Sequence, residues 1–348
     1  MITEPRQLPN TLRLPANAQT AIDLSSQADA IEAVAYASKA KCGLRCLGEG
    51  SNVVLMPEVQ GLVCYIKDTS IRVLSLDENF VTIAVGAGKN WHELVEETLA
   101  QGWFGLENLA LIPGSVGAAP IQNIGAYGVE VAQFIESVNV IDPDQNVRDI
   151  PASACGFAYR DSVFKARLAA ADNALIILGV TFRLQLRPTV NLSYAELAEA
   201  LELNAGKEAM ADKPNGQATN APTPTQVAAA VMAIRRNKLP DPYEHPNAGS
   251  FFKNPVIDDE IAQRLETLAI KPYPFAGGFK VSAAQLIDVA GWKGTRSGDV
   301  GCWPHQPLVL VNYGQASADD LLGFAQEIQR SVSEQFEIQL EMEPSVVS

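Results

Sequence analysis

The sequence predicts a mixed α and β protein with more than one domain. Its 348 residues exceed what one typical core accommodates, and this length indicates two or three domains. Helical and strand patterns alternate through the first part of the chain, where two glycine-rich segments, 47–56 and 106–128, interrupt them. Hydrophobic residues make up 47% of the chain, as in an ordinary globular protein.

The first part of the chain begins with a predicted helix over 28–39. Ser25 and Ser26 precede it, and a serine hydroxyl there can accept a hydrogen bond from the first turn. Gly86-Ala87-Gly88 opens a second predicted helix, from about 91 to 101. Apolar patterning predicts strands at 44–47, 53–56, 61–66, 81–85, 137–141 and 174–185.

The next segment, 204–225, is of low complexity and has few large apolar residues. Such a segment buries too little surface to offset its ordering entropy, so we expect a mobile loop without chemistry. A helix is predicted over 225–238, and it ends in the cations Arg235, Arg236 and Lys238. Two interpretations stay open: these cations suit the negative end of the helix dipole, or they bind an anion.

Composition excludes several classes of function. The chain has 40 acidic and 26 basic residues, and its net charge of −14 argues against binding nucleic acid. No apolar run approaches the roughly 18 residues of a membrane span, and no secretory pattern is evident, so we expect a cytoplasmic protein without a membrane partner. The five cysteines and three histidines are scattered, which predicts reduced thiols and no metal site.

Two superficial dinucleotide signatures carry little weight. Residues 48–53 and 86–91 begin with a GxG pattern but lack the third glycine. Neither is followed by a convincing βαβ unit with an acidic residue about 20 positions later, which argues against a Rossmann domain. The chain also has no GxxxxGK[ST] phosphate loop.

The segment 106–128 is predicted to be a ligand loop. It is largely apolar, carries no Lys or Arg, and contains Gly114, Gly117, Gly125 and Gly128. Glycine permits positive φ and lets a flat or anionic ligand approach backbone amides closely. The competing interpretation is a long surface loop, but such loops usually carry solvating charges.

The segment 245–255 is the second candidate for chemistry. It places Ser250 between Gly249 and two aromatic residues, with Lys253 and Asn254 just beyond. No GxSxG elbow or evident His–Asp pair is present to activate a hydrolytic serine. Ser250 could donate a proton to a carbanion in a pocket that is poor in water, or it could be incidental at the entry to a strand.

Six segments in this order resemble the UDP-N-acetylenolpyruvoylglucosamine reductase family: LGEGSNV at 47–53, the loop at 106–128, YRDSVF at 159–164, MAIRRNKLPDP at 232–242, AGSFFKNP at 248–255 and EME at 341–343. The segment around Tyr194 resembles the family's type I branch, which folds a tyrosine loop over the substrate. The resemblance implies an α+β protein with an FAD-binding PCMH/VAO-type fold. Its implied parts are two α/β subdomains, 1–69 and 70–188, and a C-terminal α+β substrate-binding domain, 189–348, which contains the insert at 204–225.

The resemblance also implies a reaction. A hydride from NADPH passes through non-covalent FAD to the enolpyruvyl β-carbon of a UDP-sugar, and the α-carbon then takes a proton. Ser250 matches the family's proton donor, and Arg160 and Glu343 match the groups that hold and polarise the carboxylate. The family's Glu-Pro-Glu-Val-Arg ending reads Glu341-Met342-Glu343-Pro344-Ser345 here, so the register of Glu343 is open by a position or two.

The ligand contacts follow from the same resemblance. Tyr127 matches the loop tyrosine near the carboxylate, Tyr194 and Lys238 match contacts to the diphosphate, and the other implied substrate contacts are Asn254, Tyr273 and Gln306. The implied flavin contacts are Gly48, Glu49, Gly50, Ser51, Asn52, Val53, Ile112, Pro113, Gly114, Ser115, Gly117, Ala118, Gln122, Asn123, Ile124 and Gly125.

We expect a monomer whose partner is the small UDP-sugar. Two other functions are weighed against the reductase: an oxygen-using FAD oxidase of the same fold, and a catalytically silent nucleotide-sugar-binding protein.

Overall fold

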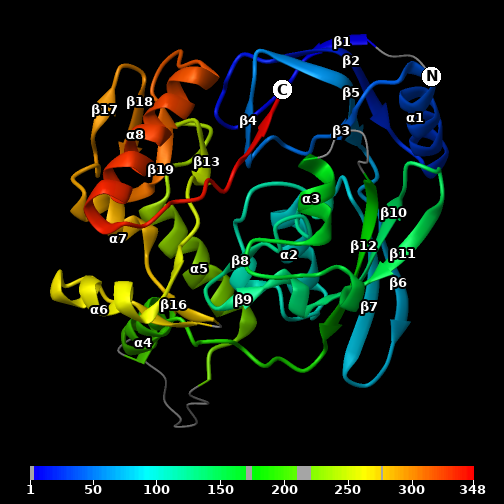
Figure 1. Ribbon diagram of the computed structural model, residues 1–348. Coiled ribbons are helices and arrows are strands. Elements are labelled where there is room, and N and C mark those ends of the chain that lie inside the picture. Colours follow the sequence, from blue (N-terminus) through cyan, green and yellow to red (C-terminus); the bar gives the residue numbers. More distant parts are fainter. Residues whose placement is uncertain (1–3, 170–174, 210–220, 276) are drawn as a thin grey trace. The chain divides into compact units, whose positions relative to one another are not determined.

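The computed structural model describes residues 4–169, 175–209, 221–275 and 277–348 (Figure 1). The chain forms two compact units. Unit 1 comprises Met1–Glu4, Thr20–Gly48 and Gln60–Arg235, and unit 2 comprises Pro5–Gln19, Glu49–Val59 and Arg236–Ser348. The domain limits at 69/70 and 188/189 that the resemblance implies stay predictions.

A five-stranded antiparallel sheet organises much of unit 1. Its order is β11-β10-β12-β7-β6, formed by Val147–Pro151, Ile135–Ile141, Ile176–Gln185, Phe80–Gly86 and Ile71–Leu76. Along β7, Val81, Ile83 and Val85 alternate with less buried residues, so one face of the strand enters the core. Helix α2 (Trp91–Ala100) contributes Trp91 and Leu94 to the same core.

A second sheet has the order β1-β2-β5-β3, formed by Glu4–Gln7, Asn17–Leu24, Glu58–Ile66 and Leu44–Cys46. Strands β3 and β5 are parallel. Helix α1 (Gln27–Ala40) shares a core with this sheet through Ala30, Ala33, Val34 and Ala37. Of the two candidate caps, Ser26 is the N-cap, in a capping box with Asp29.

The other elements that precede β13 in the chain are short, apart from two helices. The loop expected over 204–225 is wrong for its first residues, because helix α4 (Ala195–Ala209) continues through 204–209. Ala, Lys and Glu in that stretch are good helix formers. Positions 210–220 of the insert lie outside the described residues. Helix α5 (Pro224–Lys238) confirms the predicted helix. The short elements are η1 Glu107–Leu109, η2 Val116–Ala118, β8 Gly125–Ala126, β9 Val129–Glu130, η3 Val131–Gln133, η4 Ala152–Ala154 and α3 Val163–Ala169.

Unit 2 has an antiparallel sheet of order β13-β19-β18-β17, formed by Asn247–Ser250, Gln306–Asn312, Val300–Trp303 and Arg296–Ser297. Helices α7 (Ala283–Val289) and α8 (Ala318–Phe336) pack with it around one core (Figure 1). A small sheet has the order β14-β16-β15, formed by Val256–Ile257, Gly278–Lys280 and Tyr273–Phe275. Helix α6 (Asp259–Thr267) follows β14 in the sequence. The last strand, β20 (Ser345–Val347), pairs in parallel with β4 (Val53–Leu55).

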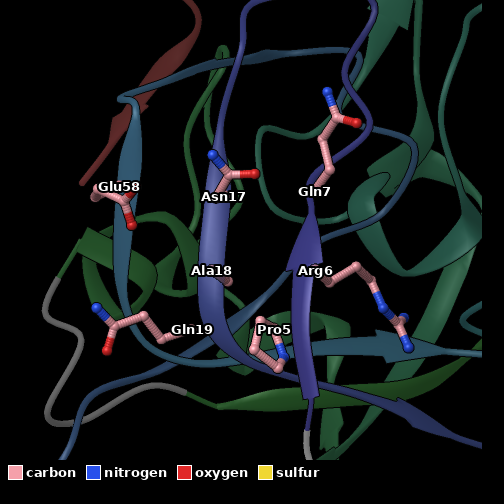
Figure 2. A pocket seen from close by; sticks show the side chains of 7 residues that line it. All are labelled: Pro5, Arg6, Gln7, Asn17, Ala18, Gln19 and Glu58. Carbon is pink, nitrogen blue, oxygen red and sulfur yellow. The ribbon is translucent and has the colours of Figure 1, made fainter.

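Several features bear on the classes of function weighed above. In the part of the chain that the structure describes, no helix combines the length and apolar character needed to cross a bilayer. No group of three or more His, Cys, Asp or Glu residues among those described could hold a metal ion. A pocket in unit 2 has a volume of about 350 Å³. Its lining residues (Figure 2) include none of the predicted site residues and are Pro5, Arg6, Gln7, Asn17, Ala18, Gln19 and Glu58.

Candidate active site

The glycine-rich loop of unit 1 is fastened to the start of α2 by backbone hydrogen bonds. Trp91 N–H donates to Gly114 O at 2.9 Å, and Val116 N–H donates to Lys89 O at 2.8 Å. Gly114 has a φ of 117°, which a residue with a side chain rarely adopts. A Cβ on Gly117 would lie 2.6 Å from the Ala87 Cβ, so packing between protein segments explains that glycine.

The two glycine-rich segments of the sequence meet within unit 1. A Cβ on Gly48 would lie 2.8 Å from Ser115 Oγ. The next residues, Glu49–Val53, belong to unit 2, where Gly50 has a φ of 67° and its carbonyl accepts from Thr11 N–H at 3.2 Å.

The loop contains two adjacent amide side chains with different surroundings. Both polar atoms of the Asn123 side chain form hydrogen bonds within the protein. Nδ2 donates to Glu130 Oε2 at 2.9 Å and to Ala158 O at 3.0 Å, and Oδ1 accepts from Ala132 N–H at 3.0 Å. Gln122 is only 8% exposed, and its buried Oε1 has no hydrogen-bond partner among the described residues. A buried acceptor costs about 1–3 kcal/mol unless it receives a donor. A flavin, which carries a ring N–H donor, fits this loop.

Arg160 lies beside the same loop. It has a positive φ of 54°, and its Nη2 donates to Gly125 O at 2.6 Å. Its guanidinium also lies 5.3 Å from the centre of the Tyr159 ring. A Cβ on Gly125 would lie 3.0 Å from both Arg160 Nη1 and Val129 O, so glycine leaves room for these two groups.

Two predicted substrate-binding tyrosines contact each other in unit 1. The rings of Tyr127 and Tyr194 pack edge to face with their centres 5.3 Å apart. Asn108 joins the two segments by donating to Tyr127 O and to Asn191 O, both at 2.9 Å. Burial raises the pKa of Tyr127 to about 12, so its hydroxyl keeps its proton at neutral pH.

Arg235 is a residue of this neighbourhood that the sequence-based predictions did not assign to the site. It lies close enough to Tyr127 and Arg160 for both to influence its pKa. The signal was present in the sequence, because Arg235 falls four residues after the buried Val231 and seven after the buried Ala228. This spacing puts a cation on the apolar face of α5.

In unit 2, the C-terminal segment brings Glu343 next to Ser250. Ser250 ends β13, and the following residue, Phe251, accepts a hydrogen bond at 2.9 Å from Glu343 N–H. Lys253 N–H donates to Glu341 O at 2.9 Å, so 341–343 run along 251–253. Glu343 is half-buried, whereas Glu341 is exposed and forms an ion pair with Lys253.

The remaining predicted substrate residues have different environments within unit 2. Asn254 Oδ1 accepts from Ala283 N–H at 2.9 Å, at the start of α7, so its oxygen has a structural role. Gln306 begins β19 and is half-buried. Tyr273 lies in β15 and is 44% exposed, and Lys238 ends α5.

The glycine-rich loop, with the Gln122 acceptor that lacks a partner among the described residues, suits a flavin, and comparison with known proteins identifies a flavoprotein. An FAD-binding domain model matches residues 18–150, and a model of the C-terminal domain of UDP-N-acetylenolpyruvoylglucosamine reductase matches residues 241–347. The predicted fold class and the FAD cofactor are confirmed.

Relatives and a solved structure extend these matches over the whole chain. The UDP-N-acetylenolpyruvoylglucosamine reductases of Pseudomonas fluorescens Pf0-1 and Polynucleobacter asymbioticus are 42% and 40% identical, over 97% of this chain and 95% and 94% of theirs. The crystal structure of the Thermus caldophilus reductase aligns over 100% of both chains, with 25% identity and a TM-score of 0.68. The chain therefore belongs to the UDP-N-acetylenolpyruvoylglucosamine reductase family.

Proposed function

We propose that this chain is an NADPH-dependent UDP-N-acetylmuramate dehydrogenase that acts as a cytoplasmic monomer. It reduces the enolpyruvyl group of UDP-N-acetylglucosamine enolpyruvate in the synthesis of peptidoglycan precursors. Family membership supports the reaction. The observation that supports the site is the hydrogen bond from Glu343 N–H to Phe251 O, which joins a half-buried glutamate through its backbone to the residue after Ser250.

The unit 1 loop is proposed to hold the cofactor. FAD bound there would supply the hydride-transfer chemistry that links NADPH to the substrate. Gln122 offers a buried acceptor to a ring N–H, and the glycine backbone around Gly114 allows close approach.

Ser250 is proposed to complete the reduction by protonating the α-carbon. Arrival of a hydride at the β-carbon leaves negative charge at the α-carbon and on the carboxylate. A free serine is a weak acid, so it needs a partner that positions its hydroxyl. Glu343 suits that role because its backbone is hydrogen-bonded to Phe251, the residue after Ser250.

Arg160 is proposed to bind the enolpyruvyl carboxylate and stabilise the charge that develops on it. A guanidinium can hold a carboxylate through two parallel hydrogen bonds. The bond from Arg160 Nη2 to Gly125 O orients the group before substrate binds, and such preorganisation strengthens transition-state stabilisation.

The UDP portion of the substrate is proposed to bind the remaining predicted residues. Tyr194 and Lys238 contact the diphosphate, and Asn254, Tyr273 and Gln306 make the other contacts. Tyr194 is 45% exposed, which suits a side chain that covers the substrate after it binds.

Anaerobic stopped-flow spectroscopy tests the proposal. The purified protein should be yellow, its flavin should be bleached by NADPH, and the colour should return when the enolpyruvyl substrate is added. Rapid recovery of colour with oxygen alone would indicate an oxidase instead. A colourless protein that still binds the UDP-sugar would indicate a silent binding protein.

A further inference from the structure

Three of the five cysteines lie together in unit 1, and all of them are free thiols. Cys46 in β3 and Cys64 in β5 are Cα partners in the parallel pairing of these two strands. Side chains at partner positions point to the same face of a sheet, and both of these belong to the core that the sheet shares with α1. Cys42, in the segment between α1 and β3, packs against the same core.

The Cys46 and Cys64 thiols are hydrogen-bonded to each other, which raises the pKa of Cys64 above its ordinary value. Burial and the neighbouring sulfurs of Cys46 and Cys42 raise this pKa further. Cys64 therefore keeps its proton, and the whole residue is buried. Cys46 is only half-buried, so of the two residues it is the one that a small solute reaches.

The other two cysteines have simpler surroundings. Cys155 Sγ donates to Pro151 O at 3.4 Å, and burial raises the pKa of the Cys155 thiol to about 11. The buried Cys302 thiol is hydrogen-bonded with Thr295. A free cysteine in a core acts as a small apolar side chain, and this explains both residues. Packing alone does not require two thiols in register on adjacent strands.

We propose that Cys46 and Cys64 form a peroxide-sensitive dithiol that closes to an intramolecular disulfide. Neighbouring strands lie about 4.8 Å apart, within the range of about 4.4–6.8 Å between the Cα atoms of a disulfide. Strand β3 has three residues and lies at the edge of its sheet, so the two sulfurs can approach without disturbing another pair of strands in that sheet. Leu47 N–H donates to Cys64 O at 3.0 Å, so the disulfide would fasten the start of the glycine-rich segment 47–56.

The proposed oxidant is hydrogen peroxide, and the reaction takes two steps. The Cys46 thiolate attacks one peroxide oxygen, the O–O bond breaks, and a sulfenic acid forms on Cys46 with release of hydroxide. Cys64 then attacks the Cys46 sulfur, so that the S–S bond forms and the S–O bond breaks with release of a second hydroxide. The two thiol protons convert both hydroxides to water, so two thiols lose two electrons and one peroxide is reduced to two waters. The negative charge on Cys46 that raises the pKa of Cys64 is gone once Cys46 is a neutral sulfenic acid, which assists the second step.

Mass spectrometry of tryptic peptides tests the proposal, because the sequence separates the three thiols. Peptide 42–45 contains Cys42, whereas peptide 46–67 contains both Cys46 and Cys64. The protein as purified is reduced, freed of reductant, treated with an equimolar amount of hydrogen peroxide and alkylated in urea. Peptide 46–67 should then lack both alkyl groups and two hydrogens, while the other three cysteines stay alkylated. Dithiothreitol added before alkylation should restore the doubly alkylated peptide.

Serine substitutions at the two half-buried cysteines are the matched pair of variants. Cys46→Ser should leave Cys64 alkylated after peroxide treatment, and Cys42→Ser should form the disulfide like the parent. In the parent protein, a disulfide that joins peptide 42–45 to peptide 46–67 would make Cys42 the partner and overturn the proposal. A peptide 46–67 that stays doubly alkylated would also overturn it, as would one that gains oxygen on Cys46 while Cys64 stays alkylated. Neither Cys46 nor Cys64 takes part in the proposed reduction, so the result is independent of the proposed function.

Discussion

Gln122 and Asn123 are adjacent amide residues. We expect replacement of Gln122 to weaken flavin binding and replacement of Asn123 to lower the stability of the protein. Gln122→Met removes a buried acceptor that has no partner among the described residues, at nearly constant volume. The stability of the flavin-free protein should change by less than about 1 kcal/mol, because no hydrogen bond within the protein is lost. FAD should bind about 5- to 150-fold more weakly, the equivalent of about 1–3 kcal/mol for one buried hydrogen bond.

Asn123→Ala is the matched comparison. It removes the acceptor for Ala132 N–H and the donors to Glu130 and Ala158, at 3.0, 2.9 and 3.0 Å. The Ala158 residue is exposed, so water can replace the donor to its carbonyl. The stranded N–H and the lost bond to a charged group together predict a loss of about 2–4 kcal/mol in the free energy of unfolding.

Urea unfolding of the flavin-free proteins and titration with FAD, followed by flavin fluorescence, measure both quantities. Bound FAD adds stability according to its affinity, so the flavin-free form must be used for the stability comparison. If Gln122→Met destabilises the flavin-free protein by 2 kcal/mol or more, its Oε1 has a structural partner. Unchanged FAD affinity would remove Gln122 from the proposed cofactor site.

Three further predictions concern single residues. Ser250→Ala should keep FAD and its reduction by NADPH, but reoxidation of the flavin by the enolpyruvyl substrate should slow by a factor of about 10²–10⁴. Ser250→Cys should recover part of the reoxidation rate. Equal slowing of both half-reactions in stopped flow would indicate a structural role for Ser250. Lys238→Ala should raise the KM for the UDP-sugar at least about tenfold without changing the flavin content measured by absorbance. Burial raises the pKa of Glu107 in the folded protein above its ordinary value of 4.5. The unfolded chain therefore loses this proton at a lower pH than the folded protein does, and the free energy of unfolding falls as the pH rises above about 4.5. Glu107→Gln should therefore be more stable than the parent in urea at pH 7, and the difference should shrink toward pH 4.

Local sequence signals were sufficient for three of the helices, α1, α2 and α5, and for several strands. Ser25 and Ser26 with the apolar spacing behind them predicted α1, and apolar patterning at 81–85 predicted β7. Strand β6 was missed because most of its residues are exposed and give no alternating pattern. Its place at the edge of the sheet depends on pairing with β7, which is not encoded in β6 alone.

The glycines of the 106–128 loop show where composition is ambiguous. Glycine content predicted ligand approach, and Gly114 has the positive φ that this interpretation allows. Gly117 and Gly125 instead make room for Ala87 and for Arg160. A sequence shows that a Cβ is excluded but does not show which group excludes it, because that group lies elsewhere in the chain.

The pairing of 251–253 with 341–343 explains why the register of the C-terminal glutamate could not be resolved from sequence. Glu341 and Glu343 have the same chemistry and lie two residues apart, so their side chains point the same way from an extended chain. The backbone bonds distinguish them: Glu341 O accepts from Lys253 N–H, while Glu343 N–H donates to Phe251 O. The bond to Phe251 pairs Glu343 with the residue after Ser250, whereas the Glu341 side chain forms an ion pair with Lys253. Glu341→Gln should therefore leave protonation by Ser250 intact, and Glu343→Gln should impair it, so the two variants separate an ion-pairing glutamate from a positioning one.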